Sequence, residues 1–157
     1  MSNLREIETK YWQSYLSTLA EEDRPLRPRV VAFHAGGRAI TDSLLQLYLA
    51  GKKSAGSSIV EDFLSAGDPL PEVGNYWILL DSRDQPSLIL RTERVVVHQF
   101  NDVPPEVAVA EGEGDLSIEY WRRAHRELYE ASLKDWGVNS IDEATVITEF
   151  FRIVFKE

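Results

Sequence analysis

The clearest pattern along the chain is a helical repeat that begins after Ser117. Side chains recur at steps of three and four and share one face of a helix, namely Ile118, Trp121, His125, Leu128, Ser132 and Trp136. Ser117 stands where an N-cap is needed. A second repeat near the start of the chain comprises Leu4, Ile7, Tyr11, Tyr15 and Leu19. Asn3 and Glu6 form a capping-box pair before it, so the pattern predicts an N-terminal helix.

Two shorter helices are predicted in the first half of the chain. One runs from Thr41 to Ala50, and Gly51 is placed to end it. The other is expected after Ser58, because Ser58 and Glu61 have capping-box spacing, and it ends near Gly67.

Runs rich in β-branched and aromatic residues predict the strands. They are Val30–Phe33, Val73–Asp81, Ser87–Gln99 and Val146–Lys156. The polar segment 82–86 has the length of a hairpin connection, and Pro104-Pro105 starts a short helical turn. Strands and helices do not alternate as βαβ units would, so the order favours an α+β fold with a mainly antiparallel sheet. A closed barrel would also protect the apolar last strand from edge-to-edge pairing.

Composition narrows the class of protein. The chain has 157 residues, 43% of them hydrophobic, which suits one domain with a real core. It has no cysteine, no run of about 18 apolar residues, and no basic-then-apolar start of a secretion signal, so we expect a cytoplasmic protein. The net charge of −9 argues against a general polyanion binder. If RNA binds, a local positive pocket must hold it.

The segment from Tyr48 to Ser58 is a candidate anion site. Lys52 and Lys53 follow a predicted helix end, and a new helix is expected at Ser58, whose first turn attracts anions. The hydroxyl groups of Ser54 and Ser57 add to this pocket for phosphate or carboxylate. The alternative is that the lysines only offset the dipole of the preceding helix and that Ser58 only caps the next one.

Three carboxylates alternate with small residues in the loop Glu111–Asp115. Glu111, Glu113 and Asp115 could hold a divalent cation, although EF-hand spacing is missing. One glutamate could instead act as a general base. The remaining alternative is a solvated acidic loop before a helix N-terminus.

His125 lies on the apolar stripe of its predicted helix, where a core role and a catalytic role are both open. Nearby arginines at positions 122, 123 and 126 are expected on a solvated face, partly paired with glutamates at helical spacing. No Ser/His/Asp spacing and no His-Glu-x-x-His motif occurs, which disfavours the hydrolases built on those motifs.

Four segments in order resemble the ASCH family, the activating-signal-cointegrator homology domains of the PUA-like superfamily. They are Gly51–Ala55, Pro69–Gly74, Arg91–Val95 and Ala110–Arg122, and Ala124-His125 follows the last of them. The resemblance runs from about Val30 to the C-terminus. It implies a PUA-like small antiparallel or mixed β-barrel flanked by helices, formed by residues 30–157. Residues 1–29 would be the helical extension of longer bacterial members, packing on the domain.

The resemblance also implies RNA or a nucleoside as ligand. Some bacterial members look like proteins that bind single-stranded RNA in a basic cleft and cut it with a divalent ion such as Mg²⁺. The residues expected to contact RNA are Tyr48, Lys52, Lys53, Ser54, Ser58 and Arg91.

A smaller relative is an amidohydrolase that deacylates the exocyclic amine of cytidine through a Lys, a Thr and a Glu. The lysine falls on Lys53 and the glutamate on Glu111 or Glu113. The threonine falls on Gly56, which has no hydroxyl, so Ser57 would have to serve in its place. Three hypotheses follow: an RNA-cleaving hydrolase, an amidohydrolase of acylated cytidine nucleosides, and a non-catalytic module that binds a nucleotide or a protein.

Overall fold

The computed structural model describes residues 3–156, and the chain forms two compact units. The first unit contains the chain up to Ala50, Val73–Glu93, and the chain from Phe151 onward. The second contains Gly51–Glu72 and Arg94–Phe150. The predicted division into residues 1–29 and 30–157 does not coincide with these two units, and it stays a prediction. Residues 1, 2 and 157 lie outside the described part.

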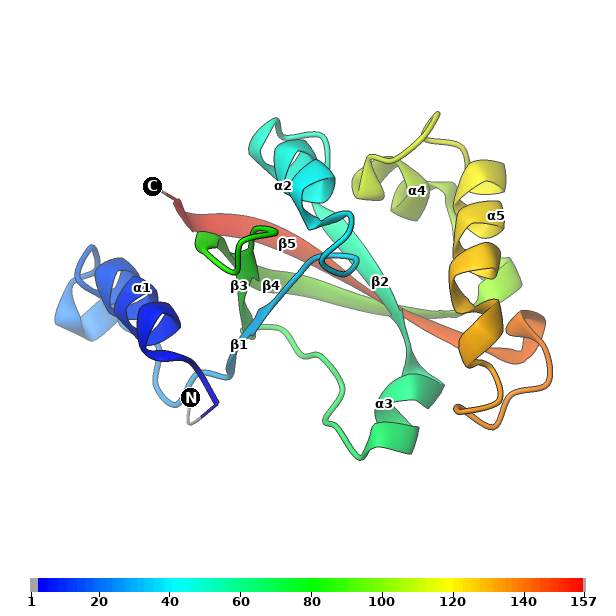
Figure 1. Cartoon of the computed structure of the whole chain (residues 1–157), viewed down its shortest axis with the longest axis horizontal. Helices are drawn as coiled ribbons and strands as arrows, with labels where there is room; N and C mark the ends of the chain where they lie inside the picture. The colour runs from blue at the N-terminus through cyan, green and yellow to red at the C-terminus, as the bar shows by residue number, and fades with distance from the viewer. Residues whose placement is uncertain (1–2, 157) are drawn as a thin grey trace. The chain divides into compact units, whose positions relative to one another are not determined.

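The first unit joins two helices to strands that pair in both directions (Figure 1). Strand β1 (Val30–Phe33) runs parallel to β3 (Tyr76–Leu80), which pairs antiparallel with the start of β4 (Pro86–Gln99). Helix α1 (Glu6–Leu16) packs Tyr11, Trp12 and Tyr15 on one side of these strands. Helix α2 (Thr41–Leu49) packs Leu44, Leu45 and Tyr48 into a separate core cluster.

The second unit carries the remaining elements. Strand β2 (Ala55–Ile59) pairs antiparallel with the first half of β5 (Thr145–Lys156), Ser57 opposite Thr148. The helices are α3 (Val60–Ala66), α4 (Pro105–Glu111) and α5 (Ile118–Tyr129). Short 3₁₀ turns connect them, at Phe100–Asp102, Glu130–Ser132 and Ile141–Glu143. Apolar residues of these elements other than α3 form one cluster around Phe100, Val107 and Trp121.

The strand order is β1-β3-β4-β5-β2, a mixed five-stranded sheet. Within residues 3–156 the β1–β3 pair is parallel, whereas β3 with β4 and β2 with β5 are antiparallel. The predicted α+β class with a mainly antiparallel sheet is therefore confirmed. Strand β5 lies between β4 and β2, so pairing on both sides protects its apolar residues. Barrel closure is not needed for this protection.

The N-terminal helix exists but begins later than predicted. Arg5, not Asn3, is its N-cap, and Glu8 accepts a hydrogen bond from the Arg5 backbone N–H. Ile7, predicted on the buried face, is exposed, whereas Trp12 is fully buried. Tyr11 and Tyr15 are buried as predicted, so the face that packs on the strands is the expected one with Trp12 added and Ile7 left out.

The predicted cap at Ser58 is wrong. Residues Ala55–Ile59 form strand β2, and α3 begins after Ile59 with no side-chain cap. Glu61 instead accepts a hydrogen bond from the backbone N–H of Thr145, 2.7 Å away, which ties α3 to the start of β5. The helix ends at Gly67, close to the predicted end, and Gly67 has the left-handed conformation.

Helix α5 is confirmed with its cap. The Ser117 hydroxyl accepts a hydrogen bond from the backbone N–H of Tyr120 at 3.0 Å. Trp121 and His125 face inward, but Leu128 is exposed and Tyr129 takes its place on the inner face. Among residues 3–156, no helix has the length and hydropathy needed to span a membrane.

Candidate functional site

Lys53 is the centre of a buried charged cluster in the second unit. It is 5% exposed, and its Nζ lies 3.1 Å from Oε2 of Glu113 and 3.6 Å from Oε1 of Glu111. It also donates to the backbone carbonyl of Glu111 at 3.2 Å. A buried ammonium is stable only when it is paired and hydrogen-bonded, and this one has both kinds of partner.

The backbone brings Glu111 to Lys53 through a close approach at Gly112. Glu111 is the last residue of α4, and Gly112 ends the helix with φ of +70°. The Ser54 N–H donates to the Ala110 carbonyl at 2.7 Å. A Cβ on Gly112 would lie 2.0 Å from the carbonyl oxygen of Lys52, so only glycine fits here.

The Glu111 carboxylate, 3% exposed, accepts two short hydrogen bonds on one oxygen. Ser57 Oγ and Trp121 Nε1 lie 2.7 and 2.6 Å from Oε2. Ser57 Oγ is also 2.7 Å from Oγ1 of Thr148, the residue opposite it in β5. Because Ser57 has one hydroxyl proton and gives it to Glu111, Thr148 must be the donor to Ser57.

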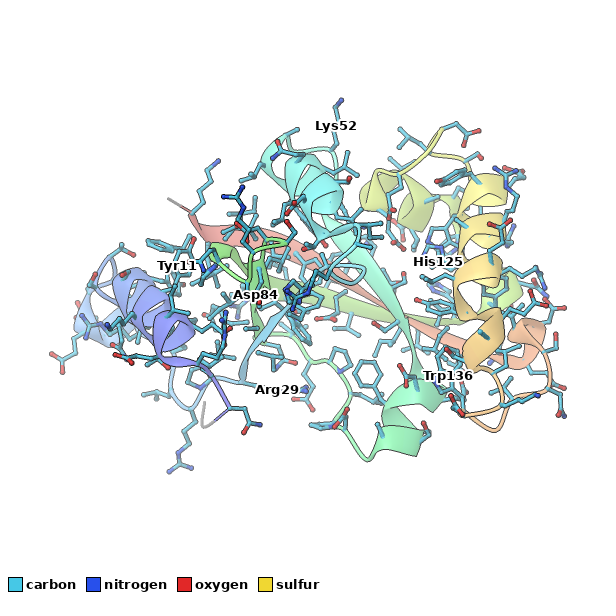
Figure 2. All side chains as sticks on the ribbon, viewed as in Figure 1. Tyr11, Arg29, Lys52, Asp84, His125 and Trp136 are labelled. Carbon is cyan, nitrogen blue, oxygen red and sulfur yellow. The ribbon has the colours of Figure 1, made fainter. Side chains whose placement is uncertain are left out.

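Aromatic side chains of α5 cover this cluster, and Figure 2 labels His125 among them. The His125 ring stacks on Trp121 with centroids 4.1 Å apart, and its Nε2 lies 3.7 Å from Glu111 Oε1. Its Nδ1 is 2.8 Å from the Trp121 carbonyl, which can only accept, so Nδ1 carries a proton. Tyr129 donates to the Ser57 carbonyl at 3.2 Å. Burial and then the charge of Glu111 raise the pKa of the Tyr129 hydroxyl, so it stays neutral.

A small cavity of about 20 Å³ adjoins Glu111 and is lined also by Glu113, Trp121 and His125. That volume is on the order of one water molecule. Ser57, by contrast, is partly exposed on β2. Of the Ser57–Glu111 pair, Ser57 is therefore the member in contact with solvent.

The arrangement has the parts of an activated nucleophile. The Ser57 hydroxyl donates to a carboxylate that can take its proton, and a cation lies 3.6 Å from the other oxygen of that carboxylate. Thr148 adds a donor that would stabilise negative charge growing on Ser57 Oγ.

The structure brings together the four residues predicted as catalytic, Lys53, Ser57, Glu111 and Glu113. Sequence reasoning missed the contributions of Thr148, Trp121 and Tyr129. The register of β2 on β5 selects Thr148, and nothing in the local sequence reveals that register.

The predicted RNA-contacting residues are dispersed. Lys52 and Ser54 are exposed, and Figure 2 shows Lys52 pointing outward. Ser58 lies half-buried on β2, so the helix N-terminus expected there as an anion site is absent from that position. Tyr48 and Arg91 belong to the first unit. Tyr48 is 4% exposed against Phe151, which leaves no face for a base to stack on. Arg91 pairs with Glu93.

The expected three-carboxylate metal site does not form. Glu111 is engaged by Ser57 and Trp121, Glu113 by Lys53, and Asp115 by the backbone N–H of Ser117 at 2.9 Å. Within residues 3–156, no three His, Asp or Glu side chains are placed to hold one ion. These residues do not fit a bound Mg²⁺, and we derive no step through one.

Comparisons with known proteins agree with this fold. An ASCH domain crystal structure from Lactobacillus crispatus superposes with a TM-score of 0.89 at 24% identity, covering 98% of each chain. A protein of Enterococcus faecalis has a TM-score of 0.79 at 27% identity, covering 94% of this chain and 88% of its own. No curated protein matches the chain.

The family profile described as ASCH domain matches residues 29–155, most of the chain, and includes every residue of the Lys53 cluster. The structural likeness extends over α1 as well, because the Lactobacillus crispatus structure covers nearly the whole chain. The fold is therefore PUA-like, as the resemblance implied, and the chain belongs to the ASCH domain family.

Proposed function

We propose that the protein hydrolyses the amide bond of an N-acylated nucleoside, with Ser57 as nucleophile. The observation that carries the proposal is the short hydrogen bond from Ser57 Oγ to Glu111, whose other carboxylate oxygen lies 3.6 Å from Lys53 Nζ. The substrate class rests on the family resemblance, and the reaction class rests on this geometry.

In the first step Ser57 Oγ bonds to the acyl carbon while its proton passes to Glu111. The electron pair of the carbonyl moves to its oxygen, where the negative charge collects, and Thr148 orients the Ser57 hydroxyl by donating to Oγ. The tetrahedral species collapses, the C–N bond breaks, and the amine leaves with the proton from Glu111.

The second step releases the acyl group. Water attacks the ester carbon and gives a proton to Glu111. The ester C–O bond then breaks, Glu111 returns the proton to Ser57 Oγ, and the carboxylic acid leaves. The ammonium group of Lys53 lies 3.6 Å from Oε1 of Glu111, the carboxylate that takes the proton in both steps. Glu113 balances Lys53 on its other side.

The test is release of cytidine from N4-acetylcytidine between pH 6 and 9. Ser57→Ala should abolish release, and Glu111→Gln should lower kcat by about 10²–10⁴-fold. Ser58→Ala is the matched control, because Ser58 is the next residue of β2 and should leave kcat unchanged. Release that persists in Ser57→Ala, or no release by the natural sequence, contradicts the proposal.

The RNA-cleavage hypothesis has less support, because it needs a divalent ion and the three predicted carboxylates have other partners. RNA binding itself stays a prediction that comes from the family. Incubating the protein with a labelled single-stranded RNA and Mg²⁺ distinguishes RNA cleavage from amide hydrolysis. Cleavage that depends on Lys53 but not on Ser57 would favour the ribonuclease hypothesis.

A further inference from the structure

Strand β2 is the last strand of the sheet, and its outer edge is formed by backbone groups of alternate residues. The strand order is β1-β3-β4-β5-β2, so β2 pairs with a strand on one side only. In an antiparallel pair the backbone N–H and C=O of successive residues point alternately toward the partner strand and away from it. The side to which Ser57 turns its backbone therefore decides which donors lie beside its hydroxyl.

The direction follows from hydrogen bonds at the start of β5. The N–H of Phe100, just after β4, donates to the carbonyl of Ala144 at 3.1 Å, so residue 144 faces β4. The N–H of the next residue, Thr145, turns the other way and donates to Glu61, which follows β2 in α3. Continued along β5, this alternation turns the backbone of Thr148 toward β4 and away from β2.

Ser57 and Thr148 are therefore a non-hydrogen-bonded pair, in which the two backbones turn away from each other. Side chains of such a pair lie close together, which agrees with the 2.7 Å between the two hydroxyl oxygens. The N–H and C=O of Ser57 thus both point to the outer edge of β2. The C=O accepts from the Tyr129 hydroxyl at 3.2 Å, whereas the N–H donates to no partner within residues 3–156.

The proposed hydrolysis needs donors at this edge. When Ser57 Oγ bonds to the acyl carbon, negative charge collects on an oxygen only two bonds from Oγ, within reach of the N–H of Ser57 itself. Donors held at roughly 2.7–3.1 Å from such an oxygen stabilise the transition state. Because burial raises the pKa of Tyr129, its hydroxyl keeps the proton that it would donate.

We propose that the backbone N–H of Ser57 and the hydroxyl of Tyr129 form the oxyanion hole of this site. During attack the Tyr129 hydroxyl turns its hydrogen bond from the Ser57 carbonyl to the substrate oxygen, and it turns back when the tetrahedral species collapses. No covalent bond to Tyr129 forms or breaks. The inference rests on the proposed function, because it needs Ser57 as the nucleophile, and it supplies the donors for the charged oxygen of that reaction.

The test is the rate at which p-nitrophenyl acetate acetylates Ser57, followed by release of nitrophenolate and by the mass of the labelled protein. This probe isolates the acylation step and does not depend on a nucleoside. Tyr129→Phe should slow acetylation by about 10²-fold, through loss of one donor. Tyr120→Phe is the matched control, because Tyr120 lies on the same helix and loss of its hydroxyl should leave the rate unchanged.

The thiono ester of the same probe distinguishes hydrogen bonding to the oxyanion from a change in structure. Sulfur accepts hydrogen bonds weakly, so a thiocarbonyl gains little from the two donors. The natural sequence should therefore favour the oxygen ester at least about tenfold more than hydroxide in solution does. This preference should fall at least about tenfold in Tyr129→Phe, whereas a misplaced Ser57 would slow both esters alike.

The oxyanion hole is overturned if the natural sequence has no more preference for the oxygen ester than hydroxide has, or if Ser57 is not acetylated. It is also overturned if Tyr129→Phe keeps the full preference, or if Tyr120→Phe loses as much as Tyr129→Phe. If the expected results are obtained but N4-acetylcytidine is not cleaved, the oxyanion hole stands and the proposed substrate is wrong.

Discussion

Gly112 is the residue at which the candidate site is most sensitive to a single added carbon. Gly51 and Gly112 have nearly the same left-handed backbone, with φ of +75° and +70°. A Cβ at Gly51 meets nothing within 4 Å, whereas one at Gly112 meets the backbone of Lys52 and Lys53. Alanine variants at these two positions therefore distinguish the cost of a left-handed backbone, which both have, from the cost of a steric clash, which only Gly112→Ala has.

We predict that Gly51→Ala costs about 1 kcal/mol of unfolding free energy and that Gly112→Ala costs at least about 2 kcal/mol more. The added clash must push the Lys52–Lys53 segment away from Glu111, so Gly112→Ala should also lose the proposed hydrolysis. Urea unfolding measures the free energies. Equal losses of unfolding free energy in the two variants would show that the close packing of Gly112 on the Lys52 backbone does not contribute to stability.

The histidines differ in which ring nitrogen holds the proton, and this is measurable. In His125 the Nδ1–H faces the Trp121 carbonyl, whereas in His34 it is Nε2 that lies 2.7 Å from Oδ1 of Asp84. Hydrogen bonding to each acceptor fixes the tautomer of the neutral ring. The Nε2 atom of His125 is then left to face Glu111.

We expect ¹⁵N NMR of the neutral rings to show a pyrrole-type Nδ1 for His125 and a pyrrole-type Nε2 for His34. The chain has only three histidines, so substitution of one at a time assigns the signals. A pyrrole-type Nε2 in His125 would mean that the ring directs its proton to the Glu111 carboxylate and not to the Trp121 carbonyl.

Two serines with similar local signatures show how elements depend on context. Ser117 and Ser58 both precede a helical pattern, and Ser58 also has the better capping-box partner in Glu61. Only Ser117 caps a helix, since β5 recruits residues Ala55–Ile59 as a strand. Backbone pairing with a strand distant in the sequence outweighs a local propensity of this size.

Ser117→Ala should therefore cost about 1 kcal/mol of unfolding free energy through loss of the α5 cap. Ser58→Ala should cost less than half of that, because no helix terminus depends on its hydroxyl. Thermal or urea unfolding of both variants measures the difference. A loss in Ser58→Ala as large as that in Ser117→Ala would mean that Ser58 has a structural contact of comparable strength.

The elements that the sequence predicted well are long and strongly patterned. Strands β3 and β4 and helix α5 follow directly from runs and periodicities in the residues. The elements that were misplaced, the start of α1 and strand β2, have weak or misleading local patterns. Ala-Gly-Ser-Ser-Ile is typical of a loop, and pairing with β5 alone makes it a strand.

At the scale of the molecule, the site was predicted as a set of residue types and not as a geometry. The resemblance named Lys53, Gly56 and a glutamate, and Ser57 was the neighbour expected to supply the missing hydroxyl. The fold shows that Glu111 meets Ser57 while Glu113 meets Lys53 from the other side. That division depends on where α4 ends against the Lys52–Lys53 backbone. The sequence alone could not predict this division, because the position of Ser57 depends on the register of β2 on β5.

The stability of the whole chain should fall in alkali, and Tyr15 is one identifiable cause. Burial and the neighbouring Tyr76 raise its pKa to about 12 in the folded state, from about 10 in an unfolded chain. Between these values the unfolded chain has released the proton and the folded chain still holds it. The contribution of Tyr15 is thus complete below pH 10 and is lost as the pH rises through about 12.

We expect the unfolding free energy to decline between pH 10 and about 12, and the decline to be shallower in Tyr15→Phe. Phenylalanine cannot ionise, so fewer protons are released on unfolding in this pH window. Most of the ring packing against Trp12 is kept. Urea unfolding at half-unit pH steps measures the slope in both proteins. Because the slope depends only on protons bound, a constant loss of stability from the missing Tyr76 hydrogen bond shifts the curve without tilting it. Parallel curves in this window would show that Tyr15 ionises alike in the folded and unfolded chains.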